Sequence, residues 1–422
     1  MNSNRISLAA GLAAAIFAFI LLSSPATCAQ SLSVIYNFQN APDGANPVAG
    51  VTFDSHGKLY GTTQRGGTDL NGTLFQLVPG SGGNWTEQVI SDFEFTDNGG
   101  TPIAPVALDG VGNIYGTFAC TFDCFGNHGG GIFEGVHSSG GNWTMLNLAD
   151  YWAGVSNGEC MDGACGVAFD PVGRLYATTS QYQSQYGNNG AALYLGRRSI
   201  SGWYTILLYN FRGGNDGVGP SIWFSFGAND AIYSTTSSGG ASNAGTVFQL
   251  QNRGGVQWSE TQLYAFRGGS DGAFPYGGVI FDSAGNLYGT TSGGGAGYGT
   301  VFKLTHNSNG TWTESVLYPF QGGSDAAHPT GPLTFDAAGN LYGVAAGGAY
   351  GHGAIFKLVP SGGQWTESVA YSFTGGLDGD GPSGGAIFDS AGNLYGTTVH
   401  GGEYPTCSDS PYCGGVVYKF TP

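Results

Sequence analysis

The chain has 422 residues, of which 78 are glycine, 14% are aromatic and only 9% are charged, whereas about 25% of residues are charged in a typical soluble domain. The formal net charge is -16, with 12 Lys and Arg, and this excludes nucleic acid and anionic membrane surfaces as partners because both require clustered positive charge. Glycine and aromatic residues favour short strands joined by tight turns, and the few charges leave a neutral polar surface suited to hydroxyl-rich ligands.

The N-terminus reads MNSNR, then the apolar run ISLAAGLAAAIFAFILL, then SSPATCAQ. This order predicts a secretory signal peptide over residues 1–29, cleaved after Ala29. An uncleaved anchor remains an alternative, since the run approaches the roughly 20 residues that span a bilayer. We expect a secreted or periplasmic protein, with no membrane attachment after cleavage and with residues 30–422 forming one domain.

A repeat dominates that domain. The phrase FDSAGNLYGTT occurs at 281–291 and again at 388–398, and related segments bring the number of repeats to seven, with a period of 53 to 61 residues. We number the blades 1 to 7 by the tyrosines of these segments, which are Tyr60, Tyr115, Tyr176, Tyr233, Tyr288, Tyr342 and Tyr395.

Each repeat contains four predicted strands and no helical periodicity. In the fifth repeat they cover 277–282, 287–291, 299–304 and 312–320, with turns at SAGN and around Gly310. A period near 50 residues with four strands predicts an all-β, seven-bladed propeller. The last repeat stops after its third strand at 416–420, and SLSVIYNF at 31–38 matches a fourth strand, so we expect the N-terminal strand to complete the last blade and close the ring.

The succession F-D-x-x-G-N-L-Y-G-T-T, Gly-Gly, G-T-V-F-K-L and W-T-E resembles the glycine-rich GloVer (Gloeobacter/Verrucomicrobia) repeat family over residues 31–422. The resemblance implies an exported protein without an established activity. Family members often carry a C-terminal anchor, whereas this chain ends at Pro422 soon after its last predicted strand.

An aspartate begins each blade, as in GGNDGVGP and GGSDGAFP. One interpretation is a calcium site or an acidic ring at the channel mouth, because calcium binds several oxygen ligands. The alternative, which we favour, is that each carboxylate accepts hydrogen bonds within its own turn, since a residue present in every blade serves what every blade needs. These residues are Asp43, Asp97, Asp162, Asp216, Asp271, Asp325 and Asp378.

Six recurring tryptophans precede the fourth strands, and we expect them to pack between blades rather than to bind a ligand. The six cysteines after the signal peptide form three close pairs, which predict three loop disulfides in an exported protein. A zinc site is the alternative for CTFDC, although no second metal-binding pair completes it. The pairs are Cys120 with Cys124, Cys160 with Cys165, and Cys407 with Cys413.

Function in a repetitive ring is expected where the blades differ. The cysteine pairs and the longest loops belong to blades 2, 3 and 7, which together with blade 1 form one contiguous sector. Its loop aromatics, next to neutral polar residues, suit sugar rings, although they could instead cover one another. The candidate ligand-binding residues are Phe122, Phe125, Trp152, Tyr182, Tyr186, Tyr404 and Tyr412.

We therefore predict a monomeric module that binds carbohydrate or a cell-envelope component through the loops of blades 7, 1, 2 and 3, with no cofactor unless calcium binds. No catalytic constellation is evident, since His128, His328, His352 and His400 come from different blades. The alternative is an extracellular carbohydrate hydrolase or lyase that uses acidic residues of the same loops, such as Asp123 or Glu159.

Overall fold

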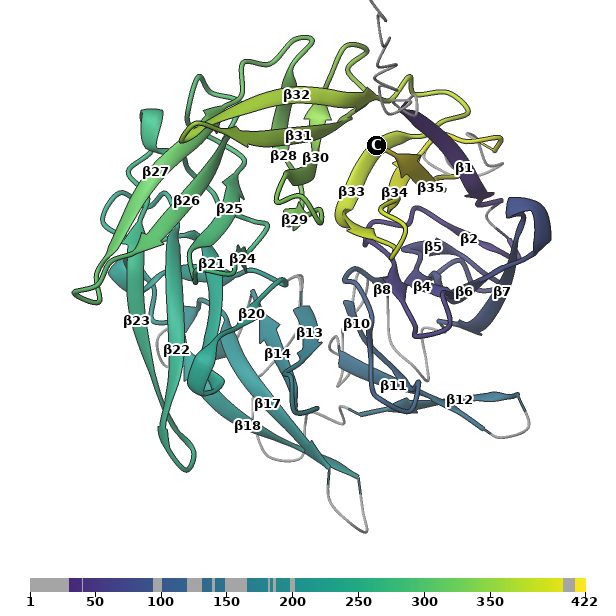
Figure 1. Ribbon diagram of the computed structural model, residues 1–422. Coiled ribbons are helices and arrows are strands. Elements are labelled where there is room, and N and C mark those ends of the chain that lie inside the picture. Colours follow the sequence, from purple (N-terminus) through teal and green to yellow (C-terminus); the bar gives the residue numbers. More distant parts are fainter. Residues whose placement is uncertain are drawn as a thin grey trace, which may run out of the picture.

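The computed structural model describes residues 30–39, 41–93, 101–119, 131–138, 141–148, 165–180, 183–184, 187–197, 202–404 and 414–422. Seven antiparallel sheets radiate from a common axis, as the blades of a β-propeller do (Figure 1). The fold class expected from the sequence is confirmed. Four predicted strands of blade 5 agree with the observed ones to within two residues at each end.

Each blade runs from an innermost strand at the axis to an outermost strand. In blades 2, 4 and 6 the innermost strand is split into two short segments that both pair with the second strand. Blade 1 contains β3 (Thr52–Phe53), β4 (Leu59–Thr62), β6 (Thr73–Pro79) and β7 (Trp85–Asp92). Blade 2 contains β8 (Thr101–Pro102), β9 (Ala107–Leu108), β10 (Ile114–Ala119), β11 (Gly131–His137) and β12 (Trp143–Asn147).

The third and fourth blades continue this order. Blade 3 contains β13 (Cys165–Phe169), β14 (Leu175–Thr179), β17 (Ala191–Arg197) and β18 (Trp203–Asn210). Blade 4 contains β19 (Val218–Pro220), β20 (Ser225–Phe226), β21 (Ile232–Ser238), β22 (Thr246–Gly254) and β23 (Gln257–Ala265).

The last three blades complete the ring. Blade 5 contains β24 (Val279–Phe281), β25 (Leu287–Thr291), β26 (Thr300–His306) and β27 (Trp312–Pro319). Blade 6 contains β28 (Ala326–Pro329), β29 (Thr334–Phe335), β30 (Leu341–Gly347), β31 (Ala354–Ser361) and β32 (Gln364–Ser372). Blade 7 contains β33 (Asp380–Phe388), β34 (Leu394–His400), β35 (Val416–Thr421) and β1 (Ser31–Asn37).

Short elements lie in the loops between these strands. They are β2 (Gly44–Ala45), β5 (Arg65–Gly66), β15 (Gln183–Ser184) and β16 (Gly187–Asn188), with the 3-10 turns η1 (Ser81–Gly83), η2 (Gly214–Asp216), η3 (Ala228–Asp230) and η4 (Gly269–Asp271).

The two ends of the chain close the ring. The N-terminal strand β1 pairs antiparallel with β35, from Ser31 opposite Thr421 to Asn37 opposite Val416, and the two lie side by side in Figure 1. Blade 7 is therefore built from both termini, as expected. The pairing removes the free edge that an incomplete last blade would expose.

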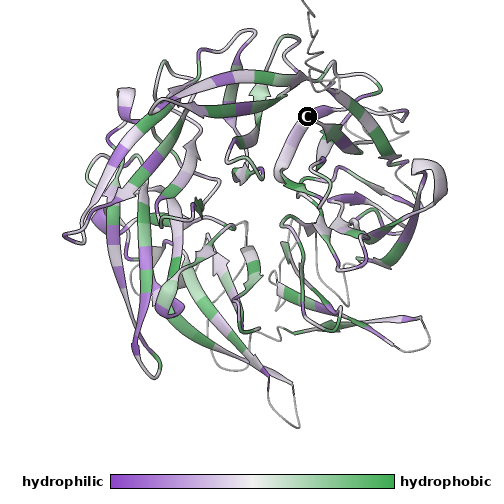
Figure 2. Cartoon of the chain, viewed as in Figure 1, coloured by the Kyte–Doolittle hydropathy of each residue, from purple (hydrophilic) through white to green (hydrophobic). Residues whose placement is uncertain are grey.

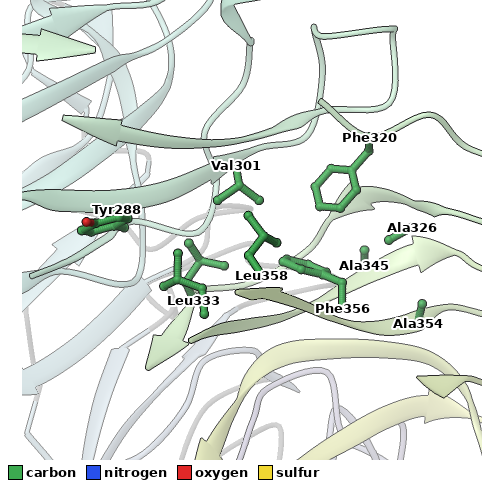
Figure 3. Packing of buried hydrophobic residues seen from close by; sticks show 10 residues of the cluster. Tyr288, Val301, Phe320, Ala326, Leu333, Ala345, Ala354, Phe356 and Leu358 are labelled. Carbon is green, nitrogen blue, oxygen red and sulfur yellow. The ribbon is translucent and has the colours of Figure 1, made fainter. Parts of the chain in front are cut away.

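The hydrophobic core is divided among the blade interfaces. Seven buried clusters are present, and each joins two neighbouring blades. Figure 3 shows the cluster between blades 5 and 6, where Phe320 and Val301 meet Phe356 and Leu358. Along the outer strands, hydrophobic and hydrophilic residues alternate (Figure 2), and exposed and half-buried side chains alternate in the same way at the start of β27.

Aromatic pairs fix the distance between blades. The phenylalanine at the end of the outermost strand packs on an aromatic ring of the next blade's third strand, with centroids 4.9–5.3 Å apart, as in Phe320 on Phe356. The ring centroid of each recurring tryptophan lies 5.7–6.5 Å from that of the tyrosine that numbers the preceding blade, as for Trp365 and Tyr288. The tryptophans therefore pack between blades, as expected.

Polar residues of the repeated phrase FDSAGNLYGTT form hydrogen bonds within the hairpin and to the next blade. In its aspartate turn, Asp282 accepts backbone N–H bonds from Ala284 and Asn286, and Tyr288 donates its hydroxyl hydrogen to the same carboxylate. The first threonine of LYGTT reaches the next blade, so that Thr397 Oγ1 donates to the Ala49 carbonyl oxygen at 2.9 Å. The phrase therefore forms a hairpin and bonds it to its neighbour.

The threonine bond predicts a measurable loss of stability at the junction that closes the ring. We expect Thr397→Val to lower the free energy of unfolding by about 1–2 kcal/mol, because the buried Ala49 carbonyl loses its side-chain donor. Valine fits this position, since Val344 occupies it in blade 6 and is fully buried. Urea denaturation checks the value, and the exposed Thr366→Val serves as control. An unchanged midpoint in Thr397→Val would show that the bond contributes nothing.

Candidate functional site

The aspartates that begin the blades are held by local hydrogen bonds. Asp325 accepts the Tyr318 hydroxyl at 3.0 Å and the Gln321 backbone N–H at 2.7 Å, and the Ala326 backbone N–H donates to its other oxygen. Every described aspartate of this set accepts the same two hydrogen bonds, from the hydroxyl of a tyrosine seven residues earlier and from the backbone N–H four residues earlier. These aspartates are Asp43, Asp216, Asp271, Asp325 and Asp378.

These contacts support the turn interpretation over the calcium interpretation. Asp97 and Asp162 lie outside the described residues. Within the part of the chain that the structure describes, no three His, Cys, Asp or Glu side chains are grouped closely enough to hold a metal ion.

A glutamate of the outermost strand lies beside this tyrosine–aspartate pair in four blades. One carboxylate oxygen of each is buried without a hydrogen-bond partner. Burial, followed by the nearby aspartate charge, raises the pKa of Glu87 to about 8 and the pKa of Glu260, Glu314 and Glu367 to about 7. The sequence places these residues in W-T-E or W-S-E, but their burial depends on the neighbouring blade and has no local signal.

The channel wall contains one residue that departs from the repeat. Where blade 4 has Trp223, the other blades have glycine or proline. The Trp223 backbone lies against Gly278 of blade 5, where an added Cβ would overlap the Trp223 carbonyl oxygen. The sequence analysis did not select Trp223. The available signal was the segment SIWFSF, which stands where other blades have a Gly or Pro before the apolar strand.

A pocket of about 410 Å³ opens beside Trp223. Its wall combines two aromatic side chains, Trp223 and Tyr276, with three serines, Ser180, Ser221 and Ser237. None of the described residues in its wall is charged. The remaining lining residues are Val218, Gly219, Pro220, Ile222 and Pro275.

Hydrogen bonds hold the two aromatic residues in place. Ser221 Oγ donates to the Tyr276 carbonyl oxygen at 2.5 Å and accepts the Trp223 backbone N–H at 3.2 Å. One serine therefore joins the backbones of blades 4 and 5 at the pocket wall. The Tyr276 side chain is 51% exposed, so its ring is available to a ligand.

A strained residue precedes this tyrosine. Phe274 has φ 60° and is 42% exposed, although a bulky side chain rarely adopts this left-handed conformation. The equivalent positions before the proline are Gly219 in blade 4 and Gly381 in blade 7, while blade 6 has His328 at φ 49°. Strained residues gather at functional sites, and Phe274 and Tyr276 flank Pro275 of the pocket wall.

The histidines do not form a cluster in the described residues. His328 Nδ1 donates to the Ser292 carbonyl oxygen at 2.7 Å, and its ring lies 5.8 Å from that of Tyr298. His352 Nδ1 lies 3.1 Å from an Asp380 carboxylate oxygen. His328 and His352 therefore each have a separate local partner, and His128 lies outside the described residues.

Most of the predicted ligand-binding residues lie outside the described residues, namely Phe122, Phe125, Trp152, Tyr182, Tyr186 and Tyr412. Tyr404 is described, and its side chain is 40% exposed. The predicted disulfides are likewise outside, apart from the backbone of Cys165 at the start of β13. We find no helix in the described ranges with the length and hydrophobicity needed to span a membrane.

The buried glutamates predict a loss of stability between about pH 5 and pH 8. Their raised pKa means that the folded chain binds protons more tightly than the unfolded chain, so the free energy of unfolding falls as pH rises through this window. We expect Glu314→Gln with Glu367→Gln to flatten the profile by about 1 kcal/mol per residue, after allowance for partial solvation. Urea titrations at several pH values measure this.

The exposed Glu403→Gln is the control for that experiment, and it should retain the wild-type slope. Burial lowers the pKa of His400, which has the opposite pH dependence, but it is common to all variants and cancels in the comparison. If the free energy of unfolding depends on pH in the same way in the wild-type protein and the double variant, the raised pKa of Glu314 and Glu367 would be contradicted.

The strain at Phe274 predicts that glycine stabilises the fold. We expect Phe274→Gly to raise the free energy of unfolding by about 0.5–1 kcal/mol, because left-handed backbone costs a residue with a Cβ about 1–2 kcal/mol and glycine recovers part of it. Chemical denaturation measures the change. Phe274→Ala, which keeps the Cβ, should give little of the gain, and a destabilised glycine variant would mean that packing of the ring outweighs the strain.

Sequence and structure comparisons gave one family match and several distant structural similarities. No curated protein matches the sequence. Among solved structures, an oxidoreductase (glucose dehydrogenase) from Thermus thermophilus is 15% identical, with a TM-score of 0.45 over 93% of this chain and 100% of that chain. A luciferin-regenerating enzyme is 14% identical, with a TM-score of 0.41 over 92% and 95% of the two chains.

An ancestral GH74 enzyme is 13% identical, with a TM-score of 0.44 over 86% of this chain and 55% of that chain. No functional conclusion follows from similarities at this level. The family described as the Gloeobacter/Verrucomicrobia repeat, in contrast, matches residues 126–345 and 226–422. The protein therefore belongs to the Gloeobacter/Verrucomicrobia repeat family.

Proposed function

We propose that this chain is an exported propeller that binds a neutral, hydroxyl-rich ligand of the carbohydrate class. The observation that carries the proposal is the pocket lined by Trp223, Tyr276 and three serines, without a charged residue. Aromatic faces stack on the C–H face of a sugar ring. Ser221 and Ser237 donate their own hydroxyl hydrogens to backbone carbonyls, so their oxygens would accept hydrogen bonds from the sugar hydroxyls. The pocket volume falls within the roughly 300–1,000 Å³ typical of small-molecule sites.

The pocket is also largely preformed. Ser221 fixes the backbones of Trp223 and Tyr276 through two hydrogen bonds, and Ser237 Oγ donates to the Val218 carbonyl oxygen at 3.2 Å. Prior ordering lowers the entropy lost on binding. The aromatic loops of blades 7, 1, 2 and 3 provide a second surface for a longer ligand, such as a polysaccharide or a cell-envelope component, and Tyr404 is its described member.

Binding is favoured over hydrolysis at this pocket. Glycoside hydrolysis requires two carboxyl groups about 5–9.5 Å apart, whereas none of the described residues that line the pocket is Asp, Glu or His. The protein would act as a monomer in the periplasm or outside the cell, after removal of residues 1–29.

A glycan array followed by calorimetry on its best ligand tests this proposal. We expect Trp223→Ala to weaken binding at least tenfold at an unchanged melting temperature, because one wall of the pocket is lost while the blade interfaces are retained. Tyr350→Ala is the matched control, since Tyr350 is 63% exposed and is not part of the pocket wall. Phe274→Gly tests whether the strained ring also contacts the ligand.

Two results would contradict the proposal. Absence of binding to every glycan would remove the carbohydrate assignment, and equal binding by wild-type protein and Trp223→Ala would move the site to the loops of the other sector. Release of reducing ends from the bound glycan would establish hydrolysis instead.

A further inference from the structure

A second cavity, of about 160 Å³, lies on the axis of the ring. Innermost segments of five successive blades line it, from Pro105 of blade 2 to Pro332 of blade 6, and these segments converge on the axis in Figure 1. We call this cavity the axial chamber. Its other lining residues are Val167, Ala168, Ile222, Trp223, Phe224, Ser225, Gly277, Val279 and Ile280.

The axial chamber is apolar because its polar groups are already bonded within the ring. Its single side-chain hydroxyl belongs to Ser225, which donates to the Val279 carbonyl oxygen at 2.5 Å. The Trp223 carbonyl oxygen accepts the Ser234 hydroxyl at 2.7 Å. A cavity of this size and apolar lining has room for a group about as large as benzene.

The axial chamber lies directly below the serine-lined pocket. Ile222 and Trp223 line both cavities. Along blade 4, Pro220 of the pocket pairs with Thr236 at one end of β21, and Ser225 of the axial chamber pairs with Tyr233 nearer the other end. The two cavities therefore follow one another along the axis, with the Trp223 backbone at their junction.

We propose that the ligand is amphipathic: a glycoside whose sugar occupies the serine-lined pocket and whose phenyl-sized apolar substituent enters the axial chamber. This inference rests on the proposed carbohydrate function and adds the chemical class of the ligand. The substituent would replace an unfilled apolar space by contacts with Ala168, Val279 and Ile280. Such burial strengthens binding about 10- to 100-fold.

Paired glycosides test the inference. Calorimetry compares each methyl glycoside of a panel with the phenyl glycoside of the same sugar, and we expect the phenyl member to bind 10- to 100-fold more tightly to the wild-type protein. Ala168→Phe fills the axial chamber and should abolish this difference while leaving methyl glycoside binding intact. Ala168→Ile is a milder variant, because Ile280 holds the equivalent position in blade 5, and it should reduce the difference.

Xenon gives a readout that needs neither a variant nor a sugar. In crystals pressurised with xenon, we expect a bound atom between Ala168, Val279 and Ile280. Equal affinities for phenyl and methyl glycosides, or an axial chamber that takes no xenon, would overturn the inference, while methyl glycoside binding sensitive to Trp223→Ala would still support the proposed function. Failure of every glycoside to bind would overturn both.

Discussion

The propeller depends on one steric constraint. An aromatic side chain of the third strand occupies the space that a Cβ on the facing glycine would need. In LYGTT, a Cβ on Gly289 would come 2.5 Å from Phe302 of the paired third strand, and the same phenylalanine receives Phe266 of the preceding blade. Each such glycine makes room for a ring that joins two blades, whereas blade 4 has Ser234 at this position opposite Phe248. Blade 3 shows the reciprocal change, since Leu193 replaces the phenylalanine and Ala177 replaces the glycine.

This constraint explains where the chain is free to vary. The second, third and fourth strands touch both neighbouring blades, so a changed side chain there disturbs two interfaces. Parts of the innermost segments and of the loops that precede them meet the axis or solvent instead, although Val279 and Leu333 pack at blade interfaces. Trp223 and Phe274 occupy such positions, and the fold tolerates a bulky ring in one blade where the others have Gly, Pro or a different residue. Residues that give this protein its own function can therefore differ from the repeat only at the axis and in these loops.

The fold was predictable because its determinants are local and repeated. Seven copies of one phrase, the missing fourth strand of blade 7 and the matching segment at 31–38 sufficed for the blade number and the closure. The site was not predictable in the same way. Trp223 and Tyr276 are separated by 53 positions and meet only because adjacent blades superpose, and the burial of Glu314 depends on a tyrosine and an aspartate of other segments. A comparison of the repeats position by position would have found Trp223, but not the cavities on either side of it.

The distribution of charge connects the scaffold to the chemistry of its pocket. The chain carries 28 Asp and Glu, yet the aspartates of the described repeats bond to their own turns, as Asp282 does, and four glutamates are buried between blades with raised pKa. The aspartate carboxylates stabilise their own turns, whereas the half-buried glutamates lower stability when they ionise, and neither set lines the pocket or the axial chamber in the described residues. The pocket and the axial chamber are left neutral in a strongly acidic protein. A charged ligand would meet no opposite charge among the described residues of these walls, whereas hydroxyl groups and an apolar ring would each meet a matching wall.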